Sequence, residues 1–145
     1  KKNEILLTER KPEYKLDPDY LCLPGGHVDD TRKGLIENLK REIKEEINYN
    51  FENSDIKLVD SIIDKVRYQD DQKNNKGILS REHNFLWNVY LHADNFDSNQ
   101  KIKPGDDCRK IIWLSINRVQ VNPRISSGLK RMIKKARKIY PQSFN

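Results

Sequence analysis

The chain has 145 residues, of which 35% are hydrophobic and 34% are charged, and its formal net charge is +6. That length suits one domain over residues 1–145 with its own hydrophobic core. No apolar run is long enough to span a bilayer, and the two cysteines, Cys22 and Cys108, are too few for a disulfide framework. We therefore exclude membrane and disulfide-stapled classes and expect a cytoplasmic protein. The positive charge fits an anionic ligand without identifying it.

Hydrophobic patterning predicts five strands and two helices, separated by polar loops. In chain order these are strands at 4–10 and 20–23, a helix from near Gly34 to near Asn48, strands at 55–67, 83–92 and 111–114, and a helix at 127–140. In the strand at 83–92, apolar residues alternate with Asn88, Tyr90 and His92, which is the pattern of a half-buried strand. Strands before and after a central helix, with a second helix at the end, predict an α/β/α sandwich.

The central helix carries a concentration of acidic residues in the segment Arg41-Glu42-Ile43-Lys44-Glu45-Glu46. Residues three and four apart share a helix face, so Glu42 lies beside both Glu45 and Glu46. Like charges at this spacing repel one another, and a divalent cation would compensate, since Mg²⁺ is usually held by carboxylates and substrate phosphates. On the opposite side a stripe of apolar residues predicts the face that packs on the core; its members are Leu35, Leu39, Ile43 and Ile47.

Pro24-Gly25-Gly26 stands just before this helix, and paired glycines allow backbone conformations and close approaches that a Cβ would block. Residues 23–50 as a whole resemble the Nudix box, whose pattern is G-x5-E-x7-R-E-U-x-E-E-x-G-U, with U a bulky aliphatic residue. The R-E-U-x-E-E core is complete in residues 41–46. We therefore identify the chain as similar to the Nudix family.

The match to the box departs from the pattern at three places. Asn48 replaces the last Gly of the pattern, and Asn tolerates the left-handed conformation that stops a helix. Tyr49 replaces the final aliphatic residue. Gly26 is fifteen positions before the arginine of the core, where the pattern needs fourteen, so the first glutamate falls on Arg32 or Lys33. This loss concerns the outer part of the metal site and leaves the three central carboxylates in place.

The resemblance implies an α/β fold, a Nudix-type α/β/α sandwich with a mixed sheet, and Mg²⁺- or Mn²⁺-dependent hydrolysis of a phosphoanhydride bond. The substrate implied is a nucleoside diphosphate linked to another group. Carried over by position, the metal ligands would be Glu42, Glu45, Glu46 and the carbonyl of Gly25. Gly26 would complete the loop that binds the metal, and Arg41 would orient the carboxylates.

The family often draws a further acid from a loop after the box. Candidates in this chain are Glu82, Asp106 and Asp107. We prefer the pair before the strand at 111–114, and name Asp107, because Trp113 follows at a spacing similar to that of a tryptophan common in the family.

The substrate stays open at this stage. Residues 6–10, Leu-Leu-Thr-Glu-Arg, resemble the L-L-T-x-R segment of coenzyme A diphosphatases, which also have the extra residue in the box and an acid as at Asp29. Other residues of that subfamily pattern are missing. The positive charge equally suits capped or triphosphorylated RNA and dinucleoside polyphosphates. An alternative is a catalytically weak Nudix-like module that binds nucleotides or RNA through the basic helix at 127–140; the oligomeric state is open.

Overall fold

The structure is a computed structural model that describes residues 3–12, 20–51, 56–65, 85–93, 96–105 and 108–144. The first half of the chain forms β1 (Glu4–Arg10), β2 (Leu21–Cys22), α1 (Leu35–Ile47) and β3 (Ile56–Lys65). The second half forms β4 (Phe85–Ala93), β5 (Cys108–Ser115), α2 (Ile116–Val121), α3 (Ser127–Ile139) and the 3-10 helix η3 (Pro141–Phe144). Within these residues, no helix has the length and apolar character needed to cross a membrane.

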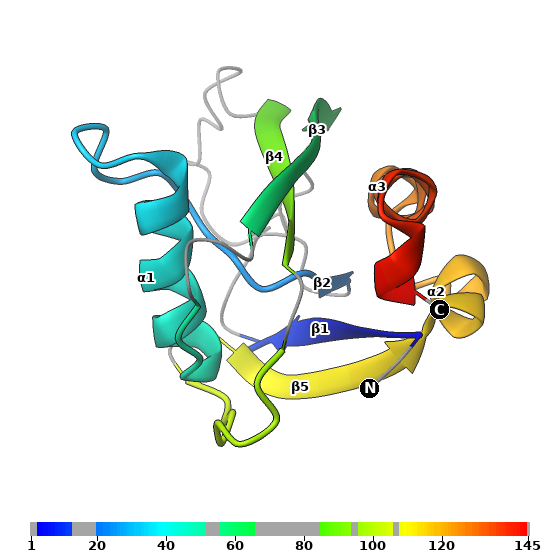
Figure 1. Ribbon diagram of the computed structural model, residues 1–145, viewed down its shortest axis with the longest axis horizontal. Coiled ribbons are helices and arrows are strands. Elements are labelled where there is room, and N and C mark those ends of the chain that lie inside the picture. Colours follow the sequence, from blue (N-terminus) through cyan, green and yellow to red (C-terminus); the bar gives the residue numbers. More distant parts are fainter. Residues whose placement is uncertain are drawn as a thin grey trace, which may run out of the picture.

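The strands form a three-stranded sheet in the order β2-β1-β5 and a two-stranded sheet of β3 and β4. α1 lies on one side of the strands, and α2 and α3 lie on the other (Figure 1). The predicted α/β sandwich is confirmed by this layering. Every strand pair in the described part of the chain is antiparallel, so the parallel pairing of a mixed sheet is not among these residues.

Most of the core lies between the strands and α3, where Leu7 of β1 is completely buried. The apolar stripe predicted for the last helix is buried at Leu129, Met132, Ile133 and Ala136. A second region of core joins α1 to the loop before β5, through Ile43 and Ile47 packed with Tyr49, Phe96 and Ile102. The fold therefore holds α1 at its C-terminal half, which is the half that carries the glutamates.

The prediction that Leu35 faces the core is wrong, because Leu35 is 48% exposed. The apolar partners of α1 pack against its later turns. The first turn follows the largely exposed loop at 27–34. Periodicity alone shows which face is apolar but not where along the helix the packing partners end.

β4 also departs from its predicted pattern. Tyr90 packs against the core between the strands and α3, including the buried group of Val59, Ile116, Ala136 and Phe144. The ring of His92 stacks on Tyr140 and Phe144 with centroid distances of 5.0 and 5.4 Å. The face that simple alternation leaves to solvent therefore lies against α3 and η3. Neither α2 nor η3 is predicted by the sequence pattern, because six-residue and four-residue helices are too short to show a period.

Asn48 ends α1 with φ 56° and ψ 37°, and its N–H donates to the carbonyl of Lys44 at 3.0 Å. The predicted left-handed helix stop is confirmed. We expect Asn48→Gly to leave the free energy of unfolding unchanged or to raise it by less than about 1 kcal/mol, since Gly adopts positive φ without steric cost. Asn48→Ala should lose about 1 kcal/mol. Urea titration measures both, and clear destabilisation by Asn48→Gly would show that the Asn side chain makes a stabilising bond.

The ammonium of Lys135 on α3 hydrogen-bonds the carboxylate of Asp60 on β3. This bond, with a second from the backbone of Ser61, holds the pKa of Asp60 below 3.8. A depressed folded pKa stabilises the native state above the unfolded pKa and loses that effect as pH falls through the folded value. Lys135→Gln should therefore be less stable than the unchanged protein at neutral pH, and the difference should shrink below pH 3.8.

Urea titrations across this pH range test the Lys135 prediction. Lys134→Gln is the matched control, because Lys134 is exposed on the same turn of α3 and its removal takes away the same charge. The loss in free energy of unfolding caused by Lys135→Gln should not stay constant down to acid pH, and Lys134→Gln should not reproduce it. Either result would contradict a stabilising role of the bond between Lys135 and Asp60.

Candidate active site

Two glycines bring the loop after β2 directly onto the acidic face of α1. Gly25 has φ 149°, a conformation that side chains disfavour, and its N–H donates to Oε2 of Glu46 at 2.9 Å. A Cβ on Gly26 would lie 1.9 Å from Oε2 of Glu42, so the carboxylate of Glu42 could not keep its position if this residue carried a side chain. The glycines are therefore needed for the loop to lie against both carboxylates.

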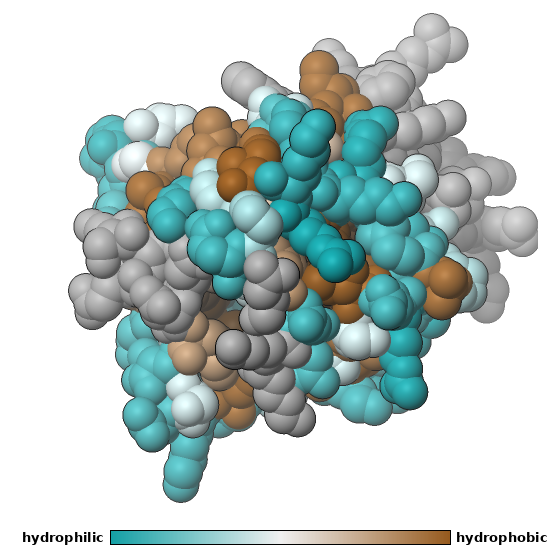
Figure 2. All heavy atoms as spheres, turned by 45° about the vertical axis from the view of Figure 1, so that its right-hand side comes forward, coloured by the Kyte–Doolittle hydropathy of each residue, from teal (hydrophilic) through white to brown (hydrophobic). Residues whose placement is uncertain are grey.

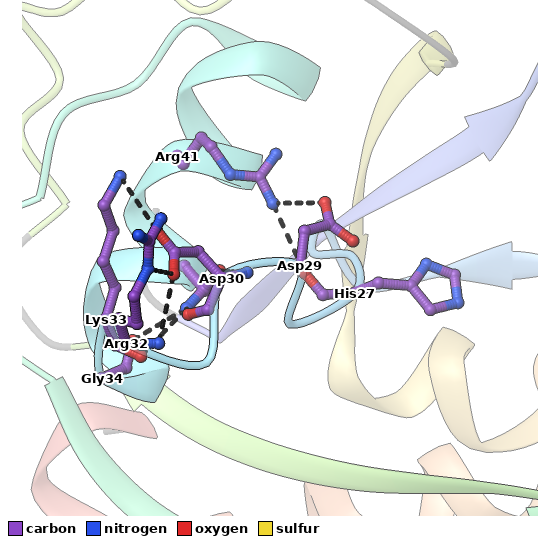
Figure 3. A network of polar contacts seen from close by, with 8 residues as sticks. His27, Asp29, Asp30, Arg32, Lys33, Gly34 and Arg41 are labelled. Atoms are coloured by element: carbon purple, nitrogen blue, oxygen red, sulfur yellow. Dashed lines mark hydrogen bonds and ion pairs between the residues drawn. The ribbon is translucent and has the colours of Figure 1, made fainter.

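Arg41 gathers carboxylates from the helix and from the loop. Its Nη2 donates to Oε1 of Glu42 at 2.5 Å and to Oδ2 of Asp29 at 2.9 Å, and its Nη1 donates to Oε2 of Glu45 at 2.8 Å. Nη2 also lies 3.4 Å from the carbonyl of His27. The loop half of this arrangement is visible in Figure 3, where the imidazole of His27 points away from Arg41. Arg41 thus contacts two of the three glutamates that the sequence assigns to the metal.

The three glutamates differ in exposure and in charge environment. Glu46 is 5% exposed and Glu42 is partly buried, whereas the side chain of Glu45 is 43% exposed. Burial raises the pKa of Glu42, although the hydrogen bond and the charge of Arg41 oppose the shift and the charges of Glu45 and Asp29 add to it. A group whose pKa is raised by burial and like charges favours a nearby cation, which would stabilise its ionised form.

The loop before β5 is attached to the same end of α1. The N–H of Gly105 donates to the carbonyl of Glu46 at 2.9 Å, and the N–H of Lys103 donates to the carbonyl of Ile47 at 3.1 Å. A Cβ on Gly105 would lie 2.5 Å from the carbonyl oxygen of Glu45, so this loop also approaches the helix through a glycine. The candidate loop acids Asp106, Asp107 and Glu82 lie outside the described residues.

The carboxylates suit a hard cation by their chemistry. In the described part of the chain, no three acidic, histidine or cysteine side chains converge on one point as a metal site would require. Arg41 contacts Glu42 and Glu45, and the N–H of Gly25 contacts Glu46. Arg41 engages one oxygen of Glu42 and one of Glu45, and each carboxylate has a second oxygen. Oxygen donors of this kind fit Mg²⁺ or Mn²⁺.

Sequence reasoning missed Asn38, a buried residue that fixes the loop. Its amide oxygen accepts from the N–H of Asp30 at 3.3 Å, and its amide nitrogen donates to the carbonyls of Asp30, Lys33 and Gly34 at 3.0, 3.3 and 3.2 Å. Asn38 is 3% exposed, so these bonds satisfy a polar group that would otherwise be costly to bury. Its position four residues before Glu42, on the acidic face, is the sequence signal that could have identified it.

Arg32 and Lys33, which occupy the place of the first glutamate of the box, contact Asp30 and not Arg41. Nε of Arg32 is 3.0 Å from Oδ1 of Asp30, and Nζ of Lys33 is 3.8 Å from Oδ2. The Arg32 hydrogen bond lowers the pKa of Asp30. Figure 3 shows this group beside, and separate from, the contact between Asp29 and Arg41.

A family profile described as NUDIX domain matches residues 1–136. This match covers most of the chain, which therefore belongs to the Nudix family. No curated protein matches the chain. The family assignment made from residues 23–50 is thus confirmed.

Solved structures share the fold at low sequence identity. A MutT/nudix family protein from Enterococcus faecalis has a TM-score of 0.67 and 17% identity over 96% of this chain, which spans only 55% of that protein. An Ap4A hydrolase from C. elegans, solved as a binary complex, has a TM-score of 0.59 and 15% identity over 96% of this chain and 87% of its own. RenU, a Nudix hydrolase from M. smegmatis, has a TM-score of 0.58 and 12% identity over 96% of this chain and 76% of its own.

Gly26→Ala tests the close approach of the loop to Glu42. The clash is with the end of a flexible side chain, so Glu42 can swing away, and we expect the free energy of unfolding to fall by no more than about 1 kcal/mol. If Glu42 is a metal ligand, as the resemblance to the Nudix box implies, the displacement of Glu42 should nevertheless weaken Mn²⁺ binding, which is followed by the loss of the free-ion EPR signal. Gly34→Ala is the control, since no atom lies within 4 Å of its Cβ position. Equal Mn²⁺ affinity in the two variants would contradict the prediction.

Proposed function

We propose that the protein is a metal-dependent hydrolase that cleaves a phosphoanhydride bond in a nucleoside diphosphate linked to another group. The observation that carries the proposal is the packing of Gly25 and Gly26 onto Glu46 and Glu42. Burying carboxylates under a backbone loop is costly unless a cation or hydrogen bonds compensate. In a Nudix protein the compensation that also serves catalysis is a divalent ion.

The residues proposed to hold Mg²⁺ or Mn²⁺ are Glu42, Glu45, Glu46 and the carbonyl of Gly25. The bound ion would neutralise the diphosphate and lower the pKa of a water molecule. The chain itself supplies the orientation: Gly25 fixes Glu46 through its N–H, and Arg41 fixes Glu42 and Glu45. These bonds limit the rotamers of three long side chains and reduce the entropy lost when a ligand binds.

Asp107 is proposed to supply the further loop acid. The bond from Gly105 to the carbonyl of Glu46, and the bond from Cys108 to the carbonyl of Gly105 at 2.8 Å, support this proposal because they fix the chain on both sides of the acid. Its role would be to take up the proton that the attacking water loses.

The proposed substrate class is a nucleotide-derived diphosphate. The segment that resembles coenzyme A diphosphatases forms β1, where Leu7 is 0% and Thr8 is 3% exposed. Side chains buried to this degree serve packing, so the resemblance there does not favour coenzyme A over other nucleotide derivatives.

The second candidate is binding of RNA without efficient hydrolysis. It is favoured by α3, whose exposed side carries the basic residues Arg131, Lys134, Arg137 and Lys138. Figure 2 brings this side of the molecule forward and shows mainly hydrophilic side chains with separate hydrophobic patches. Such a surface could contact RNA phosphates.

We also propose a cytoplasmic location. It is supported by the sequence, which has only two cysteines, Cys22 and Cys108, and so lacks the cysteine-rich composition typical of small proteins from oxidising compartments.

The proposed function predicts hydrolysis that depends on Mg²⁺ or Mn²⁺ and is lost on chelation. Glu45→Gln and Glu46→Gln should each keep the fold and lower turnover by about a hundredfold or more, because Gln preserves shape and loses charge. The amide oxygen of Gln can still accept from Gly25 at position 46. Lys44→Gln is the matched control, since Lys44 is exposed on the adjacent position of the helix.

A substrate panel decides between the two functions. It contains coenzyme A, dinucleoside polyphosphates, sugar nucleotides and triphosphorylated RNA, and the products are identified by mass spectrometry. Activity unchanged by chelator, or equal small effects at positions 44, 45 and 46, would contradict the hydrolase proposal. Retention of RNA without product would support the second candidate.

A further inference from the structure

The loop between Gly26 and α1 is one residue longer than the Nudix pattern and lacks its first glutamate. The two basic residues at that place, Arg32 and Lys33, form ion pairs with Asp30. Arg41 nevertheless binds an acid from this loop, since its Nη2 is 2.9 Å from Oδ2 of Asp29. An acid of this loop therefore contacts Arg41 although a basic residue stands where the pattern has its first glutamate.

We propose that Asp29 is a positioning residue, which holds Arg41 in place and, through Arg41, orients Glu42 and Glu45 toward the metal. The inference rests on the proposed function, because it assigns Asp29 to the same site. The guanidinium of Arg41 is held from the helix side by Glu42 at 2.5 Å and Glu45 at 2.8 Å. It is held from the loop side by Asp29 and by the carbonyl of His27 at 3.4 Å.

The position of Asp29 is fixed by the residue that follows it. The backbone of Asp30 is bound in both directions by the amide of Asn38, whose oxygen accepts its N–H and whose nitrogen donates to its carbonyl. Asn38 is on α1, one turn before Glu42, and is almost completely buried. The loop therefore moves with α1, and the carboxylate of Asp29 stays within reach of Arg41.

Asp29 also changes the charge available to a cation. With Asp29, three carboxylates surround one guanidinium, which leaves two net negative charges. Without Asp29, Arg41 would have only Glu42 and Glu45 as carboxylate partners in this group and would offset half of their combined charge. A divalent cation would then compete with the arginine for the same oxygens. Asp29 shares the guanidinium with the two glutamates, so Arg41 offsets less of their charge and more of it is left to attract a metal.

The test compares Mn²⁺ binding and metal-dependent turnover for Asp29→Asn, Asp29→Glu and Asp30→Asn. Asp29→Asn should weaken Mn²⁺ binding, measured by EPR of the free ion, about tenfold and lower kcat by a similar factor, with little change in KM, as loss of a partner that orients a metal ligand commonly does. Asp29→Glu should keep most of the Mn²⁺ affinity and most of the kcat of the unchanged protein. Asp30→Asn should match the unchanged protein, because its carboxylate contacts Arg32 and Lys33 and an Asn oxygen can still accept the N–H of Arg32.

A double-mutant cycle with Arg41→Gln tests the route of the effect. If Asp29 acts through Arg41, adding Asp29→Asn to Arg41→Gln should change Mn²⁺ affinity by less than about twofold. A full tenfold additional loss would overturn the inference, since Asp29 would then act directly on the metal or on the fold. Urea titration of each variant separates loss of folding from loss of positioning.

The outcomes distinguish this inference from the proposed function. Mn²⁺ binding without hydrolysis of any substrate would reject the proposed function, and the comparison of Asp29→Asn with Asp30→Asn would still decide the inference. Equal Mn²⁺ affinity of Asp29→Asn and the unchanged protein would overturn the inference while leaving the hydrolase proposal standing. Failure of the unchanged protein to bind Mn²⁺ would overturn both.

Discussion

The absence of side chains at Gly25 and Gly26 is the constraint on which the candidate site depends. It lets the strand β2 continue into a loop that lies on the carboxylates of α1, with the N–H of Gly25 bound to Glu46 and no atom between Gly26 and Glu42. Gly105 makes a comparable approach from the loop before β5, onto the carbonyl of Glu45. Three glycines thus bring backbone from two sides onto the last two turns of one helix, so the site is built from main chain as much as from side chains.

Arg41 balances the charge that this packing creates. Glu42 is partly buried beside other acids, and both effects raise its pKa. A buried carboxylate without a cation nearby tends to take up a proton, because the neutral form costs less free energy to bury. The guanidinium of Arg41 opposes this rise in the pKa of Glu42 through its hydrogen bond and its charge, which it keeps at any physiological pH. Arg41 therefore orients two of the acids and partly offsets their charge through the same hydrogen bonds.

The parts of the fold predicted from the sequence are those fixed by local chemistry. α1 and its left-handed end at Asn48 follow from a helical apolar period and from the conformational tolerance of Asn, and both are properties of neighbouring residues. The exposed position of Leu35 and the packing of Tyr90 and His92 against α3 and η3 depend on where distant elements end, which periodicity does not contain.

The same distinction applies to the candidate site. The acidic face of α1 was identified from spacing alone, because three and four residues define a helix side. Asn38 and Asp29 were not, since their partners are set by the path of a loop with one residue more than the family pattern. A single insertion shifts the alignment of every position in a loop, and only the three-dimensional path shows that Asp29 lies beside Arg41.

The distribution of charge separates the two candidate functions in space. The chain is positive overall, yet α1 presents acids, and the basic residues of α3 lie on the other side of the strands (Figure 1). Layers of helix and sheet pack roughly 10 Å apart, so about two layers separate the charges, and salt screens interactions beyond about 8 to 10 Å. The cations of α3 therefore cannot neutralise the carboxylates of α1. On the proposed function, a diphosphate that approaches the carboxylates of α1 would meet like charge, and a bound divalent ion would offset that charge as well as supply the chemistry.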